Sequence, residues 1–206
     1  KVAVLGAGTW GTALSKVLDN NLHSVTLWHY KKKFIDKLRN TRIHPKLNCN
    51  ISETINLTSD LDCVYNNEII VIAIPTQTIR DTLNQIENIS RNILIVSASK
   101  GIEISSLKTI SNVIQETTLI PKDNIIALYG PSHAEEVVKK LPTTIVSASI
   151  NINNARLIQD IFSNQFLRIY SNNDIIGVEI AGSIKNIIAI AAGITIGVGF
   201  GDNTLS

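Results

Sequence analysis

The chain has 206 residues, 44% of them hydrophobic, so it can bury a sizeable core and hold one domain and part of another. Nineteen lysine and arginine residues against seventeen acidic ones leave a net charge of only +2, which gives no basis for a nucleic-acid or membrane surface. Cys49 and Cys63 have neither metal-site spacing nor a disulfide framework around them. We therefore expect a cytoplasmic protein that binds a small molecule, with no metal and no nucleic acid.

Short β-branched runs alternate with helical stretches along most of the chain. The runs are VAVL at 2–5, SVTLW at 24–28, IIVIAIP at 69–75, NILIVSA at 92–98, NIIALYG at 124–130 and TTIVSAS at 143–149. Segments 82–89 and 106–115 space their apolar residues at helical intervals, whereas segment 40–54 has no period and indicates an irregular excursion. Strands this apolar are typical of a sheet covered on both faces. The pattern predicts an α/β fold with a Rossmann-like, doubly wound parallel sheet that forms one domain over residues 1–172.

The last part of the chain changes character. Residues 173–197 are almost all apolar, a length that would also suit a membrane span. Glu179 and Lys185 argue against a span, because each ionised group near a bilayer centre costs about 2.5 to 3.5 kcal/mol on insertion scales. We predict instead a long helix, capped by Asp174 and buried between two domains, without stable membrane insertion. Residues 173–206 would then be the first helix of a second, C-terminal domain whose remainder is absent from this sequence.

A glycine-rich turn directly follows the first run. Gly6-x-Gly8-x-x-Gly11 leads from the strand into the helical sequence TALSKVL, which is the context that a dinucleotide fingerprint requires. Gly6 suits the tight turn, Gly8 allows a pyrophosphate close to the backbone, and Gly11 allows the helix to pack on the strand. The free N–H groups of the helix N-terminus would face the phosphates. A plain turn would explain the glycines alone; in this context they predict a dinucleotide site.

The end of the second run bears on the type of dinucleotide. An NAD site usually carries an acid there for the ribose 2′-hydroxyl, and this sequence has none. His29, Tyr30 and Lys31 stand there instead, where a cation could hold a 2′-phosphate and a ring could stack on adenine. Lys32 and Lys33 fit equally well as solvated lysines at a helix start. The sequence therefore predicts binding of NAD or NADP, with NADPH not disfavoured.

Two later strand ends carry polar residues where ligands of open α/β sheets bind. Lys100 follows the fourth run, although a surface lysine after a strand is also common. Gly130 and Ser132 follow the fifth run, and Ala134 opens the next helix, so backbone N–H groups and the serine hydroxyl could bind an anionic substrate. A simple helix N-cap at Ser132 explains the same residues structurally. His133 is expected to be exposed there and not catalytic.

A single lysine interrupts the apolar helix of the last segment. Lys185 has long apolar stretches on both sides. Desolvation there would lower the lysine pKa toward working pH, which suits a general acid/base. Asn186 follows and can supply a polar contact to the same ligand. The alternative is a lysine that snorkels to the helix edge.

Together these motifs resemble the bacterial-type NAD(P)-dependent glycerol-3-phosphate dehydrogenases. The matching stretches are VLGAGTWGTAL, VTLW, IPTQTIRDTL, SASKGIE, GPSHAEEV, LPTTIVSAS, RIYSNNDIIGVEIAGSIKNIIAIAAGI and GFGDN, which cover most of the chain. The resemblance implies hydride transfer between C2 of sn-glycerol 3-phosphate and a nicotinamide, giving dihydroxyacetone phosphate, at the start of phospholipid backbone synthesis. One piece departs from the family, which often has a tyrosine in a YLP-like piece where this chain has IHPKLNC.

The resemblance also implies residue roles. Lys185 is expected to be the proton donor or acceptor at the substrate oxygen. The expected substrate contacts are Lys100, Gly130, Ser132 and Lys185, together with Asn186, whose side-chain amide lies next to Lys185 in the sequence. With the motif glycines, the expected cofactor contacts are Gly6, Gly8, Thr9, Trp10, Gly11, Tyr30, Lys31, Lys100 and Ala134. The resemblance further implies an all-helical C-terminal substrate domain, of which residues 173–206 would be the first helix. The family's ligands for the substrate phosphate would lie in its remainder, beyond Ser206.

Two other functions stay open at this point. A dehydrogenase of the same two-domain plan, of a 3-hydroxyacid or ketopantoate type, also places a lysine on the long helix, but GPSHAEEV and SIKNIIAIAAG discriminate against it. A non-catalytic dinucleotide sensor would keep the glycine turn and would not need an isolated lysine in an apolar helix. We also consider a homodimer as the assembly.

Overall fold

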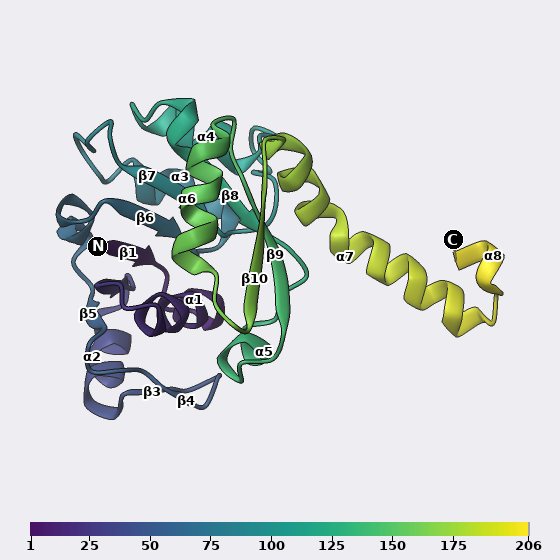
Figure 1. The fold of residues 1–206 in the computed structure, drawn as a ribbon, viewed down its shortest axis with the longest axis horizontal. Helices are drawn as coiled ribbons and strands as arrows, with labels where there is room; N and C mark the ends of the chain where they lie inside the picture. The colour runs from purple at the N-terminus through teal and green to yellow at the C-terminus, as the bar shows by residue number, and fades with distance from the viewer. Residues whose placement is uncertain (206) are drawn as a thin grey trace.

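The structure is a computed structural model, and it describes residues 1–205. Eight strands form one sheet in the order β10-β9-β8-β7-β6-β1-β2-β5 (Figure 1). They are β1 (Val2–Leu5), β2 (Val25–Trp28), β5 (Asn56–Thr58), β6 (Ile69–Ile72), β7 (Leu94–Ser97), β8 (Ile125–Tyr129), β9 (Thr143–Ala148) and β10 (Leu167–Asn172). The strand order reverses between β1 and β6, which confirms the doubly wound plan and creates the crevice where such sheets bind ligands.

The helices of residues 1–205 cover both faces of this sheet, except for most of the last long helix and the short helix after it. They are α1 (Thr9–Asn20), α2 (Lys32–Thr41), α3 (Ile79–Leu83), α4 (Ile110–Thr117), α5 (Ala134–Val138), α6 (Ile152–Phe162), α7 (Ile175–Val198) and α8 (Asp202–Leu205), with 3₁₀ turns η1 (Leu61–Asn66), η2 (Thr76–Thr78) and η3 (Lys122–Asn124). The apolar faces of α1, α2, α5 and α6 belong to one core cluster, whereas η1, α3, α4 and the start of α7 belong to the other. The strands are buried between the two, which explains their uniformly apolar sequences.

The sheet differs from the expected parallel one at a single neighbouring pair. Strands β8 and β9 are antiparallel, with Ala127 opposite Ala148, whereas the other neighbours in the sheet run parallel. The connection between them carries only the short helix α5, so β9 begins at the end of the sheet where β8 ends. A parallel β9 would need a longer crossover connection back to the other end. Strand β10 at the edge and the short β5 were not predicted.

Three local predictions need correction. Segment 40–54, expected to be irregular, contains an antiparallel hairpin of β3 (Ile43–His44) and β4 (Cys49–Asn50). The helix expected over 82–89 is wrong beyond Leu83, because Ile86 and Ile89 reach the core from a loop and only imitate helical spacing. In segment 106–115 the helix begins only at Ile110.

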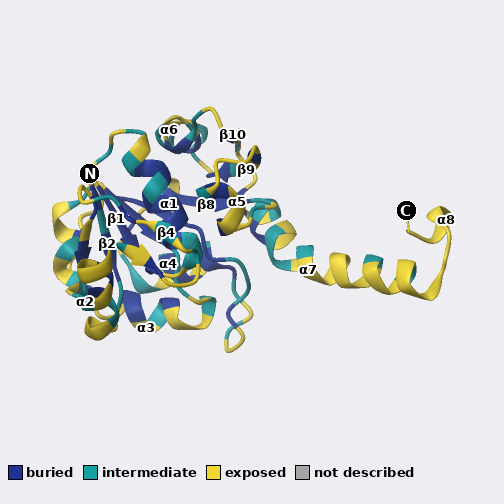
Figure 2. Cartoon of the chain, turned by 90° about the horizontal axis from the view of Figure 1, so that it is seen from below, coloured by how far each residue is buried: buried dark blue, intermediate teal, exposed yellow. Residues whose placement is uncertain are grey.

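Helix α7 leaves the sheet and projects away from it (Figure 1). Asp174 caps it, because its Oδ1 accepts a hydrogen bond of 2.8 Å from the Gly177 N–H, as the sequence predicted. Only Ile175 and Glu179 of this helix are buried, and Figure 2 shows the rest mostly exposed. Residues 1–205 supply packing partners only for the first turns of α7, and its burial between two domains stays a prediction.

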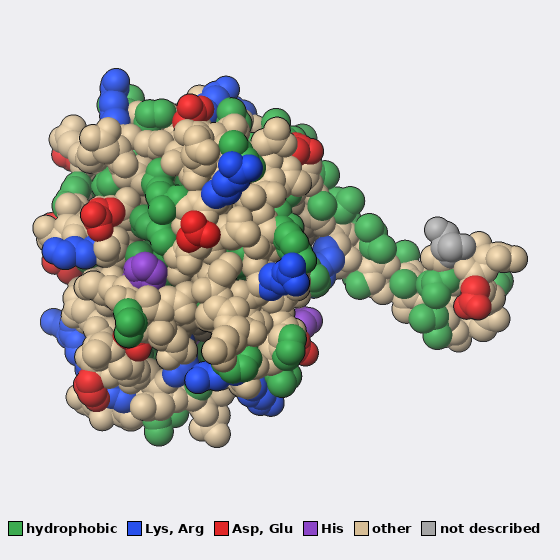
Figure 3. All heavy atoms as spheres, viewed as in Figure 1, with side chains coloured by type: hydrophobic (Ala, Val, Ile, Leu, Met, Phe, Trp, Pro, Cys, Tyr) green, Lys and Arg blue, Asp and Glu red, His purple; other side chains and the backbone are tan. Residues whose placement is uncertain are grey.

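The outer part of α7 is apolar as well as exposed. Figure 3 shows hydrophobic side chains along it, and Ile187 and Ile190 are 66% and 63% exposed. By length and composition alone, α7 is the one helix among residues 1–205 that could cross a membrane. The division of the chain at residue 172 stays a prediction.

Candidate active site

The glycine turn after β1 has the shape of a phosphate cradle. Gly6 has a φ of +121°, and a Cβ added there would lie 2.3 Å from the Ala73 carbonyl oxygen. A Cβ at Gly11 would lie 1.8 Å from the Gly6 carbonyl oxygen, so α1 can approach the strand only with glycine at that position. The Cβ position of Gly8 faces open space, with nothing within 4 Å. Two glycines therefore make the turn, and the third leaves room at the start of α1.

A hairpin residue that sequence reasoning missed supports this turn. His44 is 2% exposed, and its Nε2 lies 3.3 Å from the Ala7 carbonyl oxygen, between Gly6 and Gly8. Its Nδ1 accepts a hydrogen bond of 3.1 Å from the Leu47 N–H, so Nε2 carries the proton and donates. Burial lowers the His44 pKa, which favours this neutral form. The histidine stands in IHPKLNC, the piece that departs from the family pattern.

A cleft of about 640 Å³ opens beside the turn, where the strand order reverses. Residues from three strand ends and α3 line it: Gly6, Gly8, Trp28, His29, Tyr30, Ala73, Ile74, Pro75, Thr78, Asp81, Thr82 and Gln85. The position and size suit an extended nucleotide-containing ligand.

The end of β2 presents an aromatic and cationic cluster to this cleft. The rings of His29 and Tyr30 stack with centroids 4.8 Å apart, and Lys31 Nζ lies 5.3 Å from the Tyr30 ring centroid. His29 Nδ1 accepts a hydrogen bond from the Lys31 N–H at 3.1 Å. Lys31 is exposed, as are Lys32 and Lys33 in the first turn of α2. Of this cluster, only His29 and Tyr30 line the cleft. Lys32 and Lys33 are therefore solvated helix residues here.

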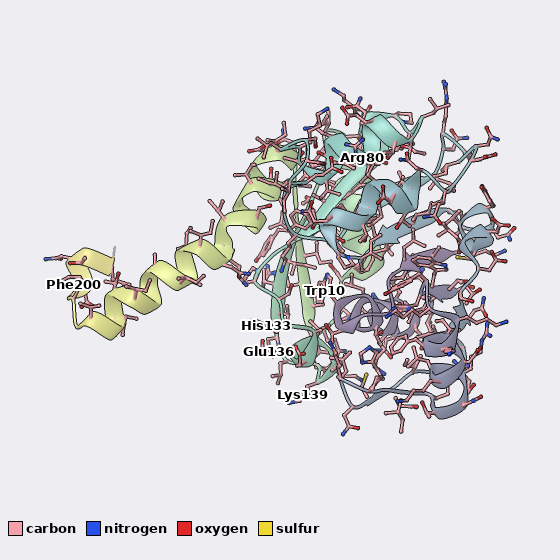
Figure 4. All side chains as sticks on the ribbon, turned by 180° about the vertical axis from the view of Figure 1, so that it is seen from behind. Trp10, Arg80, His133, Glu136, Lys139 and Phe200 are labelled. Carbon is pink, nitrogen blue, oxygen red and sulfur yellow. The ribbon has the colours of Figure 1, made fainter. Side chains whose placement is uncertain are left out.

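A second cavity, of about 340 Å³, lies on the other side of the turn. Its lining includes Thr9 and Trp10 from α1, Lys100 after β7, and Ser132, His133 and Ala134 before and within α5. Figure 4 labels Trp10 and His133 on this side of the molecule. The Trp10 Nε1–H is buried and has no hydrogen-bond partner in the described part of the chain, which is rare for a buried donor.

Lys100 is the lysine that is held most closely in the site. Its Nζ donates a hydrogen bond of 2.7 Å to the Gly130 carbonyl oxygen and lies 3.5 Å from Ser132 Oγ and 6.0 Å from the Trp10 ring centroid. Burial, and then the nearby charge of Lys185, lower the Lys100 pKa.

Lys185 reaches the same edge from α7. It lines a cavity of about 270 Å³ together with Tyr129, Gly130 and Gly182. Lys185 is half-buried, because α7 has one face open among residues 1–205 and this leaves the ammonium group access to water. Its desolvation stays a prediction. Asn186 is exposed and does not line this cavity. The structure nevertheless brings the two lysines to either side of Gly130.

The alternative reading of Ser132 as a simple N-cap does not hold. The cap residue of α5 is His133, whose side chain makes no capping bond and is exposed, as expected. Ser132 Oγ instead lies 3.4 Å from the Gly130 carbonyl oxygen and near Lys100 Nζ. The hydroxyl is thus left within the cavity, where a ligand can reach it.

Sequence reasoning missed the residues that hold the Lys100 loop. Thr76 Oγ1 donates a hydrogen bond of 2.8 Å to the Lys100 carbonyl oxygen. Arg80, labelled in Figure 4, donates to both carboxylate oxygens of Glu103, at 2.9 and 2.7 Å, and these bonds hold the pKa of Glu103 at about 2. Both donors lie in IPTQTIRDTL, a stretch that matched the family without an assigned role. Among residues 1–205 no cluster of three or more His, Cys, Asp or Glu side chains could hold a metal ion.

Comparison with known proteins identifies the family of this fold and site. Residues 1–155 match the family model described as the NAD-dependent glycerol-3-phosphate dehydrogenase N-terminus, and residues 174–206 match the corresponding C-terminus. The chain belongs to the NAD-dependent glycerol-3-phosphate dehydrogenase family. This confirms the resemblance, the α/β fold and the nicotinamide cofactor of the family, and it favours this family over the 3-hydroxyacid or ketopantoate type.

Curated relatives and solved structures give the same family. The glycerol-3-phosphate dehydrogenase [NAD(P)+] of Thermoanaerobacter sp. is 44% identical over 207 residues, covering 99% of this chain and 62% of that protein. That of Oceanobacillus iheyensis is 44% identical over 206 residues, covering 98% and 60%. The glycerol-3-phosphate dehydrogenase structure from Coxiella burnetii has a TM-score of 0.86 and 32% identity, covering 98% of this chain and 62% of that one. The structure from Plasmodium falciparum has a TM-score of 0.90 and 25% identity, covering 100% and 61%. The chain thus spans 60% to 62% of the length of these two curated relatives.

Proposed function

We propose that this chain supplies the cofactor-binding half and the acid/base of an NAD(P)-dependent glycerol-3-phosphate dehydrogenase. The enzyme would interconvert sn-glycerol 3-phosphate and dihydroxyacetone phosphate and feed glycerophospholipid synthesis in the cytoplasm. The observation that carries the proposal is the placement of Lys100 and Lys185 on either side of Gly130, next to the glycine turn. Residues 1–172 would be the dinucleotide-binding domain, and 173–206 the first part of a helical substrate domain.

The residues around the turn fit a dinucleotide. Gly8 leaves open space at the N-terminus of α1, and Trp10, whose buried Nε1–H has no partner among residues 1–205, lines the neighbouring cavity. Gly6, Gly8 and Gly11 would bring the backbone to the pyrophosphate, with Thr9 and Trp10 beside it. The remaining contacts would come from Tyr30 and Lys31 at one end and from Lys100 and Ala134 at the other. When bound, a nicotinamide would supply the hydride donor or acceptor.

The two lysines would divide the work on the substrate. Lys185 would give a proton to the carbonyl oxygen of dihydroxyacetone phosphate as it becomes a hydroxyl, and would take it back in the reverse direction. Lys100, fixed by the Gly130 carbonyl, would hold the substrate oxygen and attract the anionic substrate. Ser132 and the Gly130 backbone would complete the contacts, and Asn186 would reach the same ligand only after a change of its exposed side chain.

Several properties belong to the proposal and not to the family assignment. The small-molecule substrate would be the partner, a homodimer the assembly, and α7 would remain outside the membrane. Charge supports the last of these, because Glu179 and Lys185 both lie within the apolar helix. Nucleic acid is not an expected partner at a net charge of +2.

Equilibrium binding and turnover test this function together. We expect NADPH and NADH to bind this chain, and the natural-length protein to oxidise them with dihydroxyacetone phosphate. Cofactor binding that is unaffected by dihydroxyacetone phosphate, with no turnover in the natural-length protein, would favour the dinucleotide sensor instead. Failure to bind either cofactor would overturn both functions.

A further inference from the structure

Tyr129, at the end of β8, contacts the loop that carries Lys100. Its side chain is 2% exposed, and its hydroxyl donates a hydrogen bond of 2.6 Å to the Ser99 carbonyl oxygen. The Ser97 hydroxyl lies 3.0 Å from the Tyr129 hydroxyl oxygen and is free to donate to it. Ser99 directly precedes Lys100, so this buried phenol fixes the backbone from which the lysine side chain starts.

The ring of the same tyrosine faces α7. A Cβ added at Gly182 would lie 2.9 Å from Cδ2 of Tyr129, so the helix approaches this closely only because residue 182 has no side chain. Gly182 precedes Lys185 by three residues and therefore lies on the same face of the helix. Tyr129, Gly182 and Lys185 line one cavity with Gly130, whose carbonyl holds Lys100.

A buried carboxylate anchors α7 one turn earlier. Glu179 is 1% exposed, and its carboxylate accepts hydrogen bonds from the Ser111 N–H at 2.8 Å and from the Ser111 hydroxyl at 2.5 Å, in the first turn of α4. The pKa of Glu179 is raised by its burial. Because most later residues of α7 are exposed, this anchor and the Tyr129–Gly182 contact determine where the helix carries Lys185.

We propose that Tyr129 is a positioning residue that fixes Lys100 and Lys185 relative to each other, through its hydroxyl on Ser99 and its ring on Gly182. The consequence for catalysis rests on the proposed roles of the two lysines. The relative positioning of the two lysines does not rest on those roles, because it concerns contacts within the described fold. Tyr129 thus connects two parts of the site. One is α7, which has few other contacts, and the other is the loop that carries Lys100, which hydrogen bonds from Thr76 and Arg80 hold in place.

The spatial coupling can be measured without turnover, by titrating the Lys100 ammonium group with NMR. Lys185→Gln should raise the Lys100 pKa, because a neighbouring cation is removed, and this rise sets the scale. Gly182→Ala should raise it by about half of that or more, since the added methyl pushes α7 and Lys185 away from Tyr129. Gly193→Ala is the matched control on the same helix, because a Cβ there meets nothing within 4 Å, and it should leave the Lys100 pKa unchanged.

A second variant tests the hydroxyl without changing the packing. Tyr129→Phe keeps the ring against Gly182 and removes the bond to Ser99. In the natural-length protein kcat should fall about tenfold, as expected from imperfect positioning, with a shifted pH profile and an unchanged dissociation constant for NADPH. A purely structural role would lower the melting temperature and NADPH affinity without moving the pH profile.

The outcomes separate the positioning role from the proposed function. If Lys185→Gln shifts the Lys100 pKa while neither Gly182→Ala nor Tyr129→Phe affects it or kcat, Tyr129 does not position the lysines. If Tyr129→Phe moves the Lys100 pKa but the protein never turns over dihydroxyacetone phosphate, the positioning stands and the proposed function fails. If Gly182→Ala does not fold, Tyr129→Phe alone decides, through its effect on the Lys100 pKa and on kcat.

Discussion

The glycine turn and helix α7 bring residues to neighbouring cavities, but they are held in place very differently. The turn is fixed by backbone: Gly6 and Gly11 each stand where a side chain would meet a carbonyl oxygen, and the strand beneath is buried on both faces. Helix α7 has two buried residues, Ile175 and Glu179, and is otherwise mostly exposed. The cofactor side is therefore rigid within this chain, whereas the place of the proton donor depends on a few side-chain contacts.

The largest effect is expected on the α7 side, at the proposed acid/base. Lys185→Ala should lower kcat by roughly two to four powers of ten, the usual share of a positioned proton donor. Lys185→Arg should not restore it, because a guanidinium does not release its proton at working pH. NADPH affinity should stay close to that of the unaltered protein, since the rigid turn is untouched.

The measurement for Lys185 is a pair, kcat for dihydroxyacetone phosphate reduction and the dissociation constant for NADPH, in the natural-length protein. Turnover close to that of the unaltered protein in Lys185→Ala would show that the half-buried lysine only snorkels. Lost turnover together with lost NADPH binding would place the defect in folding and refute the claim that the turn is independent of α7.

On the turn side, substitutions of two glycines should both reduce NADPH binding but should differ in their effect on stability. Gly11→Ala places a Cβ 1.8 Å from the Gly6 carbonyl oxygen, so it should lower stability by about 1 to 3 kcal/mol and weaken NADPH binding. Gly8→Ala meets only open space, so the melting temperature should hold while NADPH binding is lost. Thermal unfolding and NADPH titration of both variants check this. Equal NADPH affinity in Gly8→Ala and the unaltered chain would contradict the cradle.

These contrasts also explain what the sequence could and could not predict. The six apolar runs and the glycine motif follow local rules, so the central strands and the turn were foreseen. Strand β10 was missed because only Leu167 and Ile169 of it are buried, a weak signal at a sheet edge. The half-burial of Lys185 depends on whether anything covers α7, which apolar composition does not determine.

The site shows the same limit. Lys100 and Lys185 could be nominated because a lysine stands out in apolar surroundings. Tyr129 could not, because a tyrosine in a buried strand looks like ordinary core until its hydroxyl is seen on Ser99. Arg80 and Glu103 are likewise ordinary charged residues 23 positions apart, and only the fold shows that they are paired.

A smaller effect, on thermal stability, is expected when acid protonates Glu103 in the loop that carries Lys100. The pKa of Glu103 is held at about 2 in the fold, below the ordinary 4.5, mainly by its hydrogen bonds with Arg80. A depressed carboxyl pKa stabilises the fold above the ordinary pKa, and that contribution is lost as the pH falls from about 4.5 toward 2. Melting temperatures across this range should therefore fall less steeply for Glu103→Gln than for the unaltered chain. Glu87→Gln, a control at an exposed residue, should keep the original dependence of melting temperature on pH. An equal dependence in all three proteins would contradict a stabilising role of the Arg80–Glu103 pair.

The smallest effect is expected at the open end of the cofactor cleft, where neither rigid backbone nor burial acts. Tyr30 is 66% exposed and Lys31 is exposed beside it, so water and salt screen any charge pair formed there. An exposed pair is worth about 0.2 to 1 kcal/mol, which corresponds to roughly a 1.4- to 5-fold change in affinity. Lys31→Ala should therefore weaken NADPH binding by up to about fivefold and leave NADH binding unchanged, and added salt should reduce the difference. Lys33→Ala is the control for a solvated lysine and should change neither constant. A preference for NADH of about a hundredfold in the unaltered chain, about 2.7 kcal/mol, would show that the end of β2 discriminates against the 2′-phosphate despite having no acid.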